Sequence, residues 1–191
     1  MWIKVAIASV PAAIIGLLFN DILDKIFYKP FPVAVMLIVY GVLFIVIENR
    51  NAGRRPSVNK IADLSMSMLL WIGFFQMLAL IPGTSRSGAT IVGALIIGVS
   101  REIAAEFTFF LAIPVMFGAS LLKLIKFGFA FTAGEFGYLM LGCVVSFAVS
   151  IFAIKFLMSY IKKNDFKVFG YYRIVLGGLI VVVSLVQMVL A

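Results

Sequence analysis

The chain has 191 residues, of which 64% are hydrophobic and only 13% charged, and its net charge is +8. Soluble domains are about half apolar and about a quarter charged, so this composition excludes an ordinary soluble domain and indicates an integral membrane protein. The cations lie mostly between apolar runs, which favours a role in membrane topology over nucleic-acid binding. We therefore expect a single polytopic membrane domain over residues 1–191, with membrane lipids and no nucleic acid as partners.

The apolar residues are grouped into runs of helical length. Apolar and polar residues do not alternate in these runs as they would in the strands of a membrane β-barrel, so we expect an all-α polytopic helical bundle. Most runs suffice, at about 1.5 Å per residue, to cross a hydrocarbon core of about 30 Å, but 89–99 is too short and is typical of a half-helix or re-entrant segment. In chain order the runs are 5–19, 33–47, 64–81, 89–99, 103–122, 136–157 and 174–191.

The first run lies at the N-terminus and resembles the apolar part of a secretory signal peptide. No small-x-small cleavage site leads from it into a soluble domain, so we expect a retained span. The next connection, 20–32, is expected to be a loop, and like the later loop 123–135 it holds only two lysines.

Two other connections are much more basic. The positive-inside rule places both 48–63 and 158–173 on the cytoplasmic side, which requires an even number of crossings between them. Either 64–81 and 89–99 form a hairpin that enters the membrane and returns, or both runs cross it. The cations concerned are Arg50, Arg54, Arg55 and Lys60 in the first region, and Lys155, Lys162, Lys163, Lys167 and Arg173 in the second.

A polar segment, "IPGTSRSGAT" at 81–90, joins these two runs. Pro82 is expected to end the first helix, and Gly83 can take a positive φ at low cost. Ser85 or Ser87 can cap the second helix, whose first N–H groups then stay free. Free amides, hydroxyls and the planar guanidinium of Arg86 form an anion site suited to phosphate.

Thr90 follows Arg86 by one helical turn, so its hydroxyl is expected to face the same spot. The alternative is that Arg86 pairs with Glu102 or Glu106, just after an N-cap expected at Ser100, and that the glycines only permit a tight turn. Gln76, in the preceding run, forms either an interhelical hydrogen bond or part of the same polar pocket.

The chain has no histidine, and its one cysteine, Cys143, lies in an apolar run. Histidine is the usual neutral-pH general base and the commonest metal ligand. We therefore expect no metal site and no cofactor in this chain by itself.

The segments "GFFQMLALIPGTSRSGATIVGALIIG" and "SREIAAEFTFFLAIPVMFGAS" closely resemble the second signature region of the undecaprenyl-diphosphate phosphatase family, the bacitracin-resistance membrane phosphatases. Their P-G-x-S-R-S-x-x-T core is matched at every fixed position. The resemblance implies hydrolysis of undecaprenyl diphosphate to the monophosphate in the bacterial cell membrane, which recycles the lipid carrier of peptidoglycan synthesis. It also implies an inverted-repeat bundle with two re-entrant hairpins at a shared site. It matches the family's arginine to Arg86, its flanking serines to Ser85 and Ser87 and its threonine to Thr90. We therefore expect catalysis by Arg86, Ser85 and Ser87, and we expect substrate binding by Gly83, Thr84, Gly88, Thr90 and Gln76.

The family's other signature, an E-x-x-x-E segment followed by two serines and a histidine, has no counterpart here. We therefore expect residues 1–191 to be the later part of a longer family member and to supply only the arginine and serine half of the site. The resemblance implies a divalent metal, Mg²⁺ or Ca²⁺, in the complete site, and a second copy of the chain is a candidate partner. The alternative function is a polyprenyl-phosphate transporter or flippase without hydrolysis, since broken helices at inverted repeats also occur in carriers.

Overall fold

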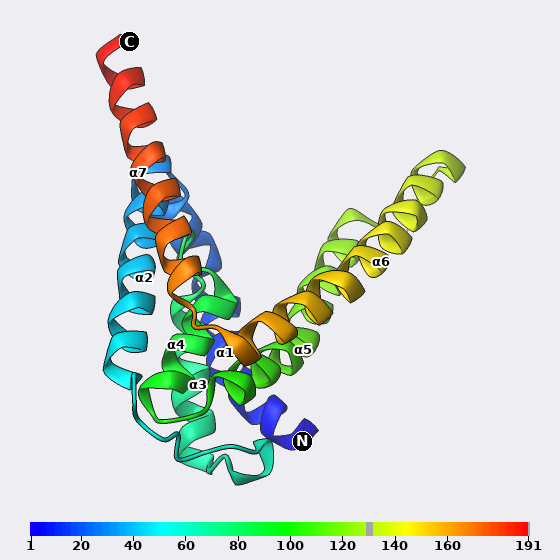
Figure 1. Ribbon diagram of the computed structural model, residues 1–191. Helices are drawn as coiled ribbons and strands as arrows, with labels where there is room; N and C mark the ends of the chain where they lie inside the picture. Colours follow the sequence, from blue (N-terminus) through cyan, green and yellow to red (C-terminus); the bar gives the residue numbers. More distant parts are fainter. Residues whose placement is uncertain (129–131, 191) are drawn as a thin grey trace.

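A computed structural model describes residues 1–128 and 132–190, and within these residues the fold is helical throughout (Figure 1). Among the described residues, β-type pairing is limited to one isolated bridge between Val58 and Val99. The elements are α1 (Trp2–Phe27), α2 (Pro30–Asn51), the short 3₁₀ turn η1 (Ile61–Asp63), α3 (Met66–Leu78), α4 (Arg86–Ile96), α5 (Arg101–Phe127), α6 (Ala133–Lys163) and α7 (Lys167–Leu190). The expected all-α polytopic bundle is confirmed.

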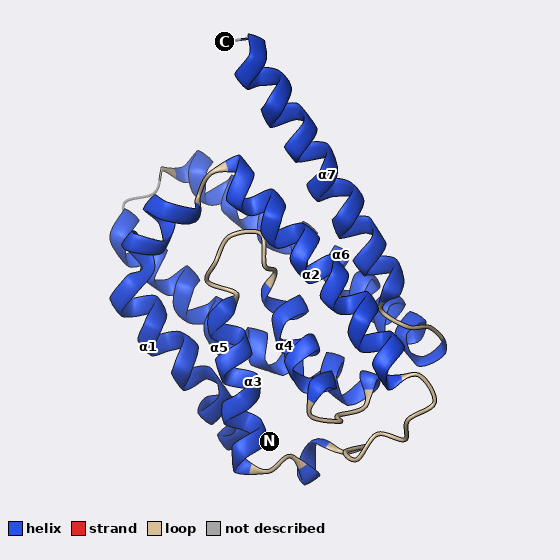
Figure 2. Ribbon diagram, turned by 90° about the vertical axis from the view of Figure 1, so that its left-hand side faces the viewer, coloured by secondary structure: helices blue, strands red, loops and turns tan. Residues whose placement is uncertain are grey.

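Four helices, α2, α5, α6 and α7, are long and apolar enough to cross a membrane. By contrast, α3 has 13 residues and α4 has 11, which is too short at about 1.5 Å per residue for a core of about 30 Å. The two short helices pack against each other, and Gly93 of α4 lies so close to Phe75 of α3 that a Cβ there would be 2.6 Å from the ring. These lengths and this packing favour the re-entrant hairpin over two full crossings, and Figure 2 shows the pair between α1 on one side and α2 and α7 on the other.

The two strongly basic regions meet at one end of the molecule, as expected. Glu48, at the end of α2, is buried and accepts hydrogen bonds from Arg101 at the start of α5 and from the backbone N–H of Phe166 between α6 and α7 (N···O 3.1 Å). At the same end the Ser57 N–H donates to the Gly98 carbonyl over 2.9 Å. Which face of the membrane this end meets stays a prediction.

The expected loop 20–32 is wrong in extent. Helix α1 continues to Phe27 and α2 begins at Pro30, because no glycine or proline interrupts the chain between Phe19 and Pro30. The region 158–173 is likewise mostly helical. Charged residues thus lie within helices in both regions, and the break between α6 and α7 is limited to residues 164–166.

Helices α2 and α7 approach each other closely through glycine. A Cβ on Gly170 would lie 2.7 Å from the Gly41 carbonyl oxygen, and one on Gly177 would lie 2.8 Å from the Ala34 carbonyl oxygen. The seven-residue spacing of Gly170 and Gly177 keeps both on one face of α7. Helices α5 and α6 extend away from this pair, so that the molecule forms two arms that converge at the connection between α6 and α7, alongside α4 (Figure 1).

Candidate functional site

The turn before α4 has the backbone conformation that its sequence predicts. Gly83 has φ +92°, and a Cβ there would collide with the carbonyl oxygen of Val33. Ser85 has φ 62°, and it is the one non-glycine residue in the described part of the chain with a positive φ. Such strained residues persist where the surrounding structure holds them, and they concentrate at functional sites.

Of the two serines considered as N-caps, Ser85 is the cap. Its Oγ accepts from the Gly88 N–H at 3.3 Å, and its carbonyl accepts from the Ala89 N–H at 2.9 Å. The Ser87 hydroxyl lies 3.3 Å from Ser85 Oγ and is exposed. The N–H groups of Arg86 and Ser87 have no hydrogen-bond partner among the described residues, so the positive end of α4 can bind an anion.

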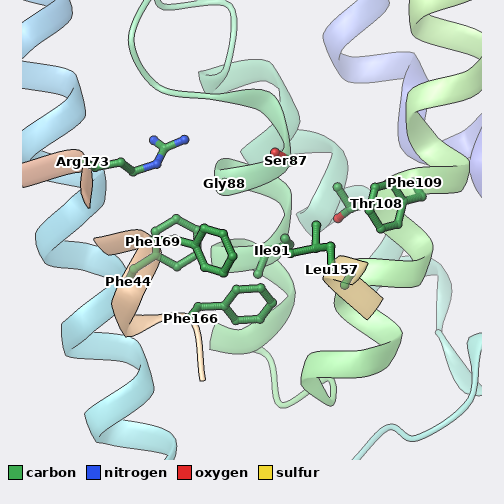
Figure 3. A pocket seen from close by; sticks show the side chains of 11 residues that line it. Phe44, Ser87, Gly88, Ile91, Thr108, Phe109, Leu157, Phe166, Phe169 and Arg173 are labelled. Carbon is green, nitrogen blue, oxygen red and sulfur yellow. The ribbon is translucent and has the colours of Figure 1, made fainter. Parts of the chain in front are cut away.

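A cavity of about 150 Å³ opens beside the first half of α4, between α2 and α7 on one side and α5 on the other (Figure 3). Its polar side chains are Ser87, Thr108 and Arg173, and the rest of its wall is apolar and rich in phenylalanine. The lining comprises Phe44, Ser87, Gly88, Ile91, Ala105, Thr108, Phe109, Leu157, Phe166, Phe169 and Arg173. The site therefore combines a cationic, hydroxyl-bearing side with an aromatic wall.

Arg173 is the cation of this cavity. Its Nη1 donates to the Thr84 carbonyl over 3.1 Å, and its guanidinium carbon lies 5.8 Å from the centroid of the Phe44 ring. The sequence indicated Arg173 only as one of the basic residues of 155–173. Its position between Gly170 and Gly177, on the α7 face that packs against α2, is the signal that could have singled it out.

Arg86, the arginine of the motif, points elsewhere. Its Nη1 donates to the carbonyl of Ala112 in α5 at 3.4 Å, and the residue is not part of the cavity lining. The alternative pairing with an acid of α5 is not observed in the described residues, since Glu102 instead pairs with Lys162 at 3.1 Å. The expected cap at the start of α5 is present, because Ser100 Oγ accepts from the Ile103 N–H.

Three residues expected to bind substrate are buried and do not line the cavity. Thr90 Oγ1 lies 2.9 Å from Thr108 Oγ1 and 3.0 Å from the Arg86 carbonyl, so it ties α4 to α5. Thr84 Oγ1 and both polar side-chain atoms of Gln76 are buried without a hydrogen-bond partner among the described residues. The interhelical hydrogen bond considered for Gln76 is therefore not observed among the described residues, and the substrate-binding assignments of these three residues stay predictions.

The cavity lacks the ligands that a hard divalent cation needs. Mg²⁺ and Ca²⁺ prefer carboxylate and carbonyl oxygens, and none of the described lining residues is acidic. Nor do three His, Cys, Asp or Glu side chains gather anywhere in the residues that the structure describes well enough to search. The residues present at this cavity thus do not fit the divalent metal that the resemblance implies.

Comparison with known proteins supplies the context of this site. Residues 1–179 match the family described as bacitracin resistance protein BacA. The undecaprenyl-diphosphatase of Acetivibrio thermocellus is 64% identical over 181 residues, covering 95% of this chain and 66% of the relative. The protein of the same name from Enterococcus faecalis is 63% identical over 96% of this chain and 67% of its own length. The protein of the same name from Desulfitobacterium hafniense is 60% identical, over 94% of this chain and 65% of its own length. The chain thus spans about two thirds of the length of these relatives.

Proposed function

The chain belongs to the bacitracin resistance protein BacA family, and from this premise we propose that it supplies the phosphate-binding half of an undecaprenyl-diphosphate phosphatase site. The names of its relatives, at 64% and 63% identity, support hydrolysis over the transporter alternative. In this reaction water attacks the terminal phosphorus and breaks its P–O bond to the bridging oxygen of the phosphoanhydride, and the products are undecaprenyl phosphate and inorganic phosphate. Because the chain spans about two thirds of those relatives, the activity belongs to the complete protein.

The observation that carries the proposal is the capped, strained start of α4 beside a cationic cavity. Phosphoryl transfer requires mainly positioning and neutralisation of charge on the phosphate oxygens. Free N–H groups at a helix N-terminus and the Ser87 hydroxyl can donate hydrogen bonds to those oxygens. Arg86 is close in the chain to these donors, and we assign it to the same headgroup, toward which its side chain would turn from the weak bond to Ala112.

The aromatic wall supports a lipid diphosphate as the substrate. Phe44, Phe109, Phe166 and Phe169 line the cavity among its polar side chains, and this apolar surface suits the first isoprene units next to the headgroup. Four helices able to cross a membrane make the chain a multi-pass membrane protein, and we assign it to the bacterial plasma membrane. A second copy of the chain remains a candidate partner, which the mass of the detergent-solubilised protein would test.

The nucleophile-activating half is not supplied by these residues. Ser85 and Ser87 have no carboxylate or lysine beside them in the cavity lining, and the chain contains no histidine. We therefore infer that the chain alone binds a diphosphate weakly and hydrolyses it negligibly. The Mg²⁺ or Ca²⁺ ion of the complete family site would need ligands from outside the described residues, and no step proposed here involves it.

The test is an Arg86→Ala substitution in a chimaera in which this chain replaces the matching region of the Acetivibrio thermocellus relative. Loss of one donor to a transition-state phosphate oxygen should lower kcat about 10²- to 10³-fold. Arg50→Ala, which removes an exposed arginine outside the cavity, serves as the matched control. Lipid translocation without hydrolysis by the unsubstituted chimaera would instead establish the transporter alternative, and unchanged hydrolysis by Arg86→Ala would overturn the role of Arg86.

A further inference from the structure

We propose that Arg173 of α7 is a second phosphate-binding residue of this site, which holds the diphosphate headgroup against the N-terminus of α4. The inference rests on the proposed function and adds to it a residue that lies far from the motif in the sequence. Arg173 reaches the motif from another helix, and its side chain points toward Ser87 in Figure 3.

Two observations place the guanidinium of Arg173 at the start of α4. Its Nη1 donates to the Thr84 carbonyl at 3.1 Å. Its Nη2 would lie 3.4 Å from a Cβ built on Gly88, and Ser85 Oγ would lie at the same 3.4 Å from that Cβ. The guanidinium therefore shares the space beside Gly88 with the capping serine. An anion bound by the free N–H groups of α4 would meet this cation directly.

The other N–H groups of Arg173 have no hydrogen-bond partner among the described residues. A guanidinium has five N–H groups, and the Thr84 carbonyl accepts from one of them. No described carboxylate forms an ion pair with Arg173, although the side chain is half-buried in a helix able to cross the membrane. Cations at such positions are costly and mark ligand sites by default. A phosphate group can accept two parallel N–H bonds from this planar fork.

The packing of α7 fixes the orientation of the side chain. Gly170 and Gly177 bring the backbone of α7 close to α2, and Arg173 lies between them on the same side of the helix. The Phe44 ring of α2 then lies 5.8 Å below the guanidinium carbon, which holds the plane of the group by a cation–π contact. This arrangement preorganises Arg173 toward the cavity, whereas Arg86 extends to α5.

The ligand chemistry assigned to Arg173 is therefore a diphosphate ester, and the probes are geranyl diphosphate and inorganic pyrophosphate. Binding to the purified 191-residue chain in detergent would be followed by ³¹P NMR up to millimolar concentrations. Arg173→Gln, which keeps much of the side-chain length but removes the charge, should raise the Kd for both probes about tenfold. Arg173→Lys keeps the charge but loses the fork and should give an intermediate Kd. Tighter binding of geranyl diphosphate than of pyrophosphate would identify the lipid as the source of the phosphate.

The controls separate this inference from the proposed function. Arg50→Gln removes an arginine outside the cavity and should change the Kd less than twofold. Weakened binding in Arg86→Gln together with unchanged binding in Arg173→Gln would overturn the inference and leave the proposed function standing. Absence of binding by the unsubstituted chain, or unchanged binding in both variants, would overturn both.

A second measurement needs no variant and so does not depend on how Arg173→Gln folds. Phenylglyoxal modifies accessible arginines, and the modified peptides can be quantified by mass spectrometry. Geranyl diphosphate should protect Arg173 several-fold while Arg50 stays equally reactive. Equal modification of Arg173 with and without the ligand would contradict its contact with the phosphate.

Discussion

At the scale of single residues, Gly83 and Ser85 form the tightest part of the site. Gly83 has φ +92° and faces the Val33 carbonyl, and Ser85 has φ 62° with its hydroxyl bonded back to the Gly88 N–H. The close approach of Val33 to Gly83 and the positive φ of Ser85 therefore restrict the backbone at two positions within three residues. Together they set the direction from which α4 presents its N–H groups.

A Gly83→Ala substitution should destabilise the chain more than its conformation alone requires. The positive φ costs a residue with a Cβ about 1–2 kcal/mol, and the collision with Val33 adds to that cost. Gly53→Ala is the matched control, because Gly53 has φ +75° but no neighbour within 4 Å of a Cβ. The free energy of unfolding by SDS titration in micelles measures both. Equal losses in the two variants would show that the Val33 contact is not tight.

At this scale the sequence predicted well the features that depend only on neighbouring residues in the chain. A proline, a glycine and a serine in order predict a helix end, a positive φ and a cap from steric and hydrogen-bonding rules alone. The direction of Arg86, the engagement of Thr90 with Thr108 and the arrival of Arg173 depend on which helices pack nearby. Nothing in the residues between 81 and 90 encodes those neighbours.

At the scale of elements, the contact between α2 and α7 is what presents Arg173 to the cavity. A Cβ on Gly177 would lie 2.7 Å from Ile38 Cγ1 and 2.8 Å from the Ala34 carbonyl oxygen, so the two backbones are nearly in contact. Small residues at helix crossings in membranes allow this approach. The contact thus links helix packing to the chemistry of the site.

Gly177→Leu should separate α7 from α2, lower the free energy of unfolding by about 1–3 kcal/mol and weaken geranyl diphosphate binding, because Arg173 moves with α7. Gly178→Leu makes the same change one residue later, where a Cβ meets nothing within 4 Å, and should leave stability and binding unchanged. Unfolding titrations and ³¹P NMR on both variants test the pair. Similar behaviour of the two variants would mean that the α2–α7 crossing does not position Arg173.

The ends of three elements are joined by Glu48, whose buried carboxylate pairs with Arg101 and accepts from the Phe166 N–H. Glu48→Gln can keep the second bond but loses the charge-assisted bonds to the partly exposed Arg101, and it should destabilise the chain by about 1.5–3 kcal/mol. Glu102→Gln removes the exposed pair with Lys162 and should cost less than about 1 kcal/mol. Thermal unfolding in detergent compares them, and equal shifts in Tm would show that burial of Glu48 does not matter.

Sequence predicted the elements with partial success. Apolar runs located the helices, and the short run 89–99 indicated the re-entrant hairpin that α3 and α4 form. The loop predicted over 20–32 is wrong in extent. The charged residues of this segment lie in α1, which continues to Phe27, and α2 begins at Pro30.

At the scale of the whole molecule, two arms converge at the connection between α6 and α7, where the Phe166 N–H donates to Glu48 of α2. Helices α2 and α7 form one arm, α5 and α6 form the other, and the cavity of about 150 Å³ lies at their junction (Figure 1). Hydropathy could not predict this arrangement, since helices such as α6 are apolar on every side and do not reveal which face packs. The positions of Phe166, Phe169 and Arg173 beside the motif follow only from that packing.

The central claim is that this chain holds the headgroup and needs further residues for hydrolysis. The most direct test is release of inorganic phosphate from undecaprenyl diphosphate in detergent, by the 191-residue chain alone and by the chimaera with the Acetivibrio thermocellus relative. We expect release by the chimaera and a rate at least about 10²-fold lower for the chain alone, because no group in the cavity activates a nucleophile. Comparable turnover by the chain alone would contradict the claim, and so would a folded chimaera that releases no phosphate.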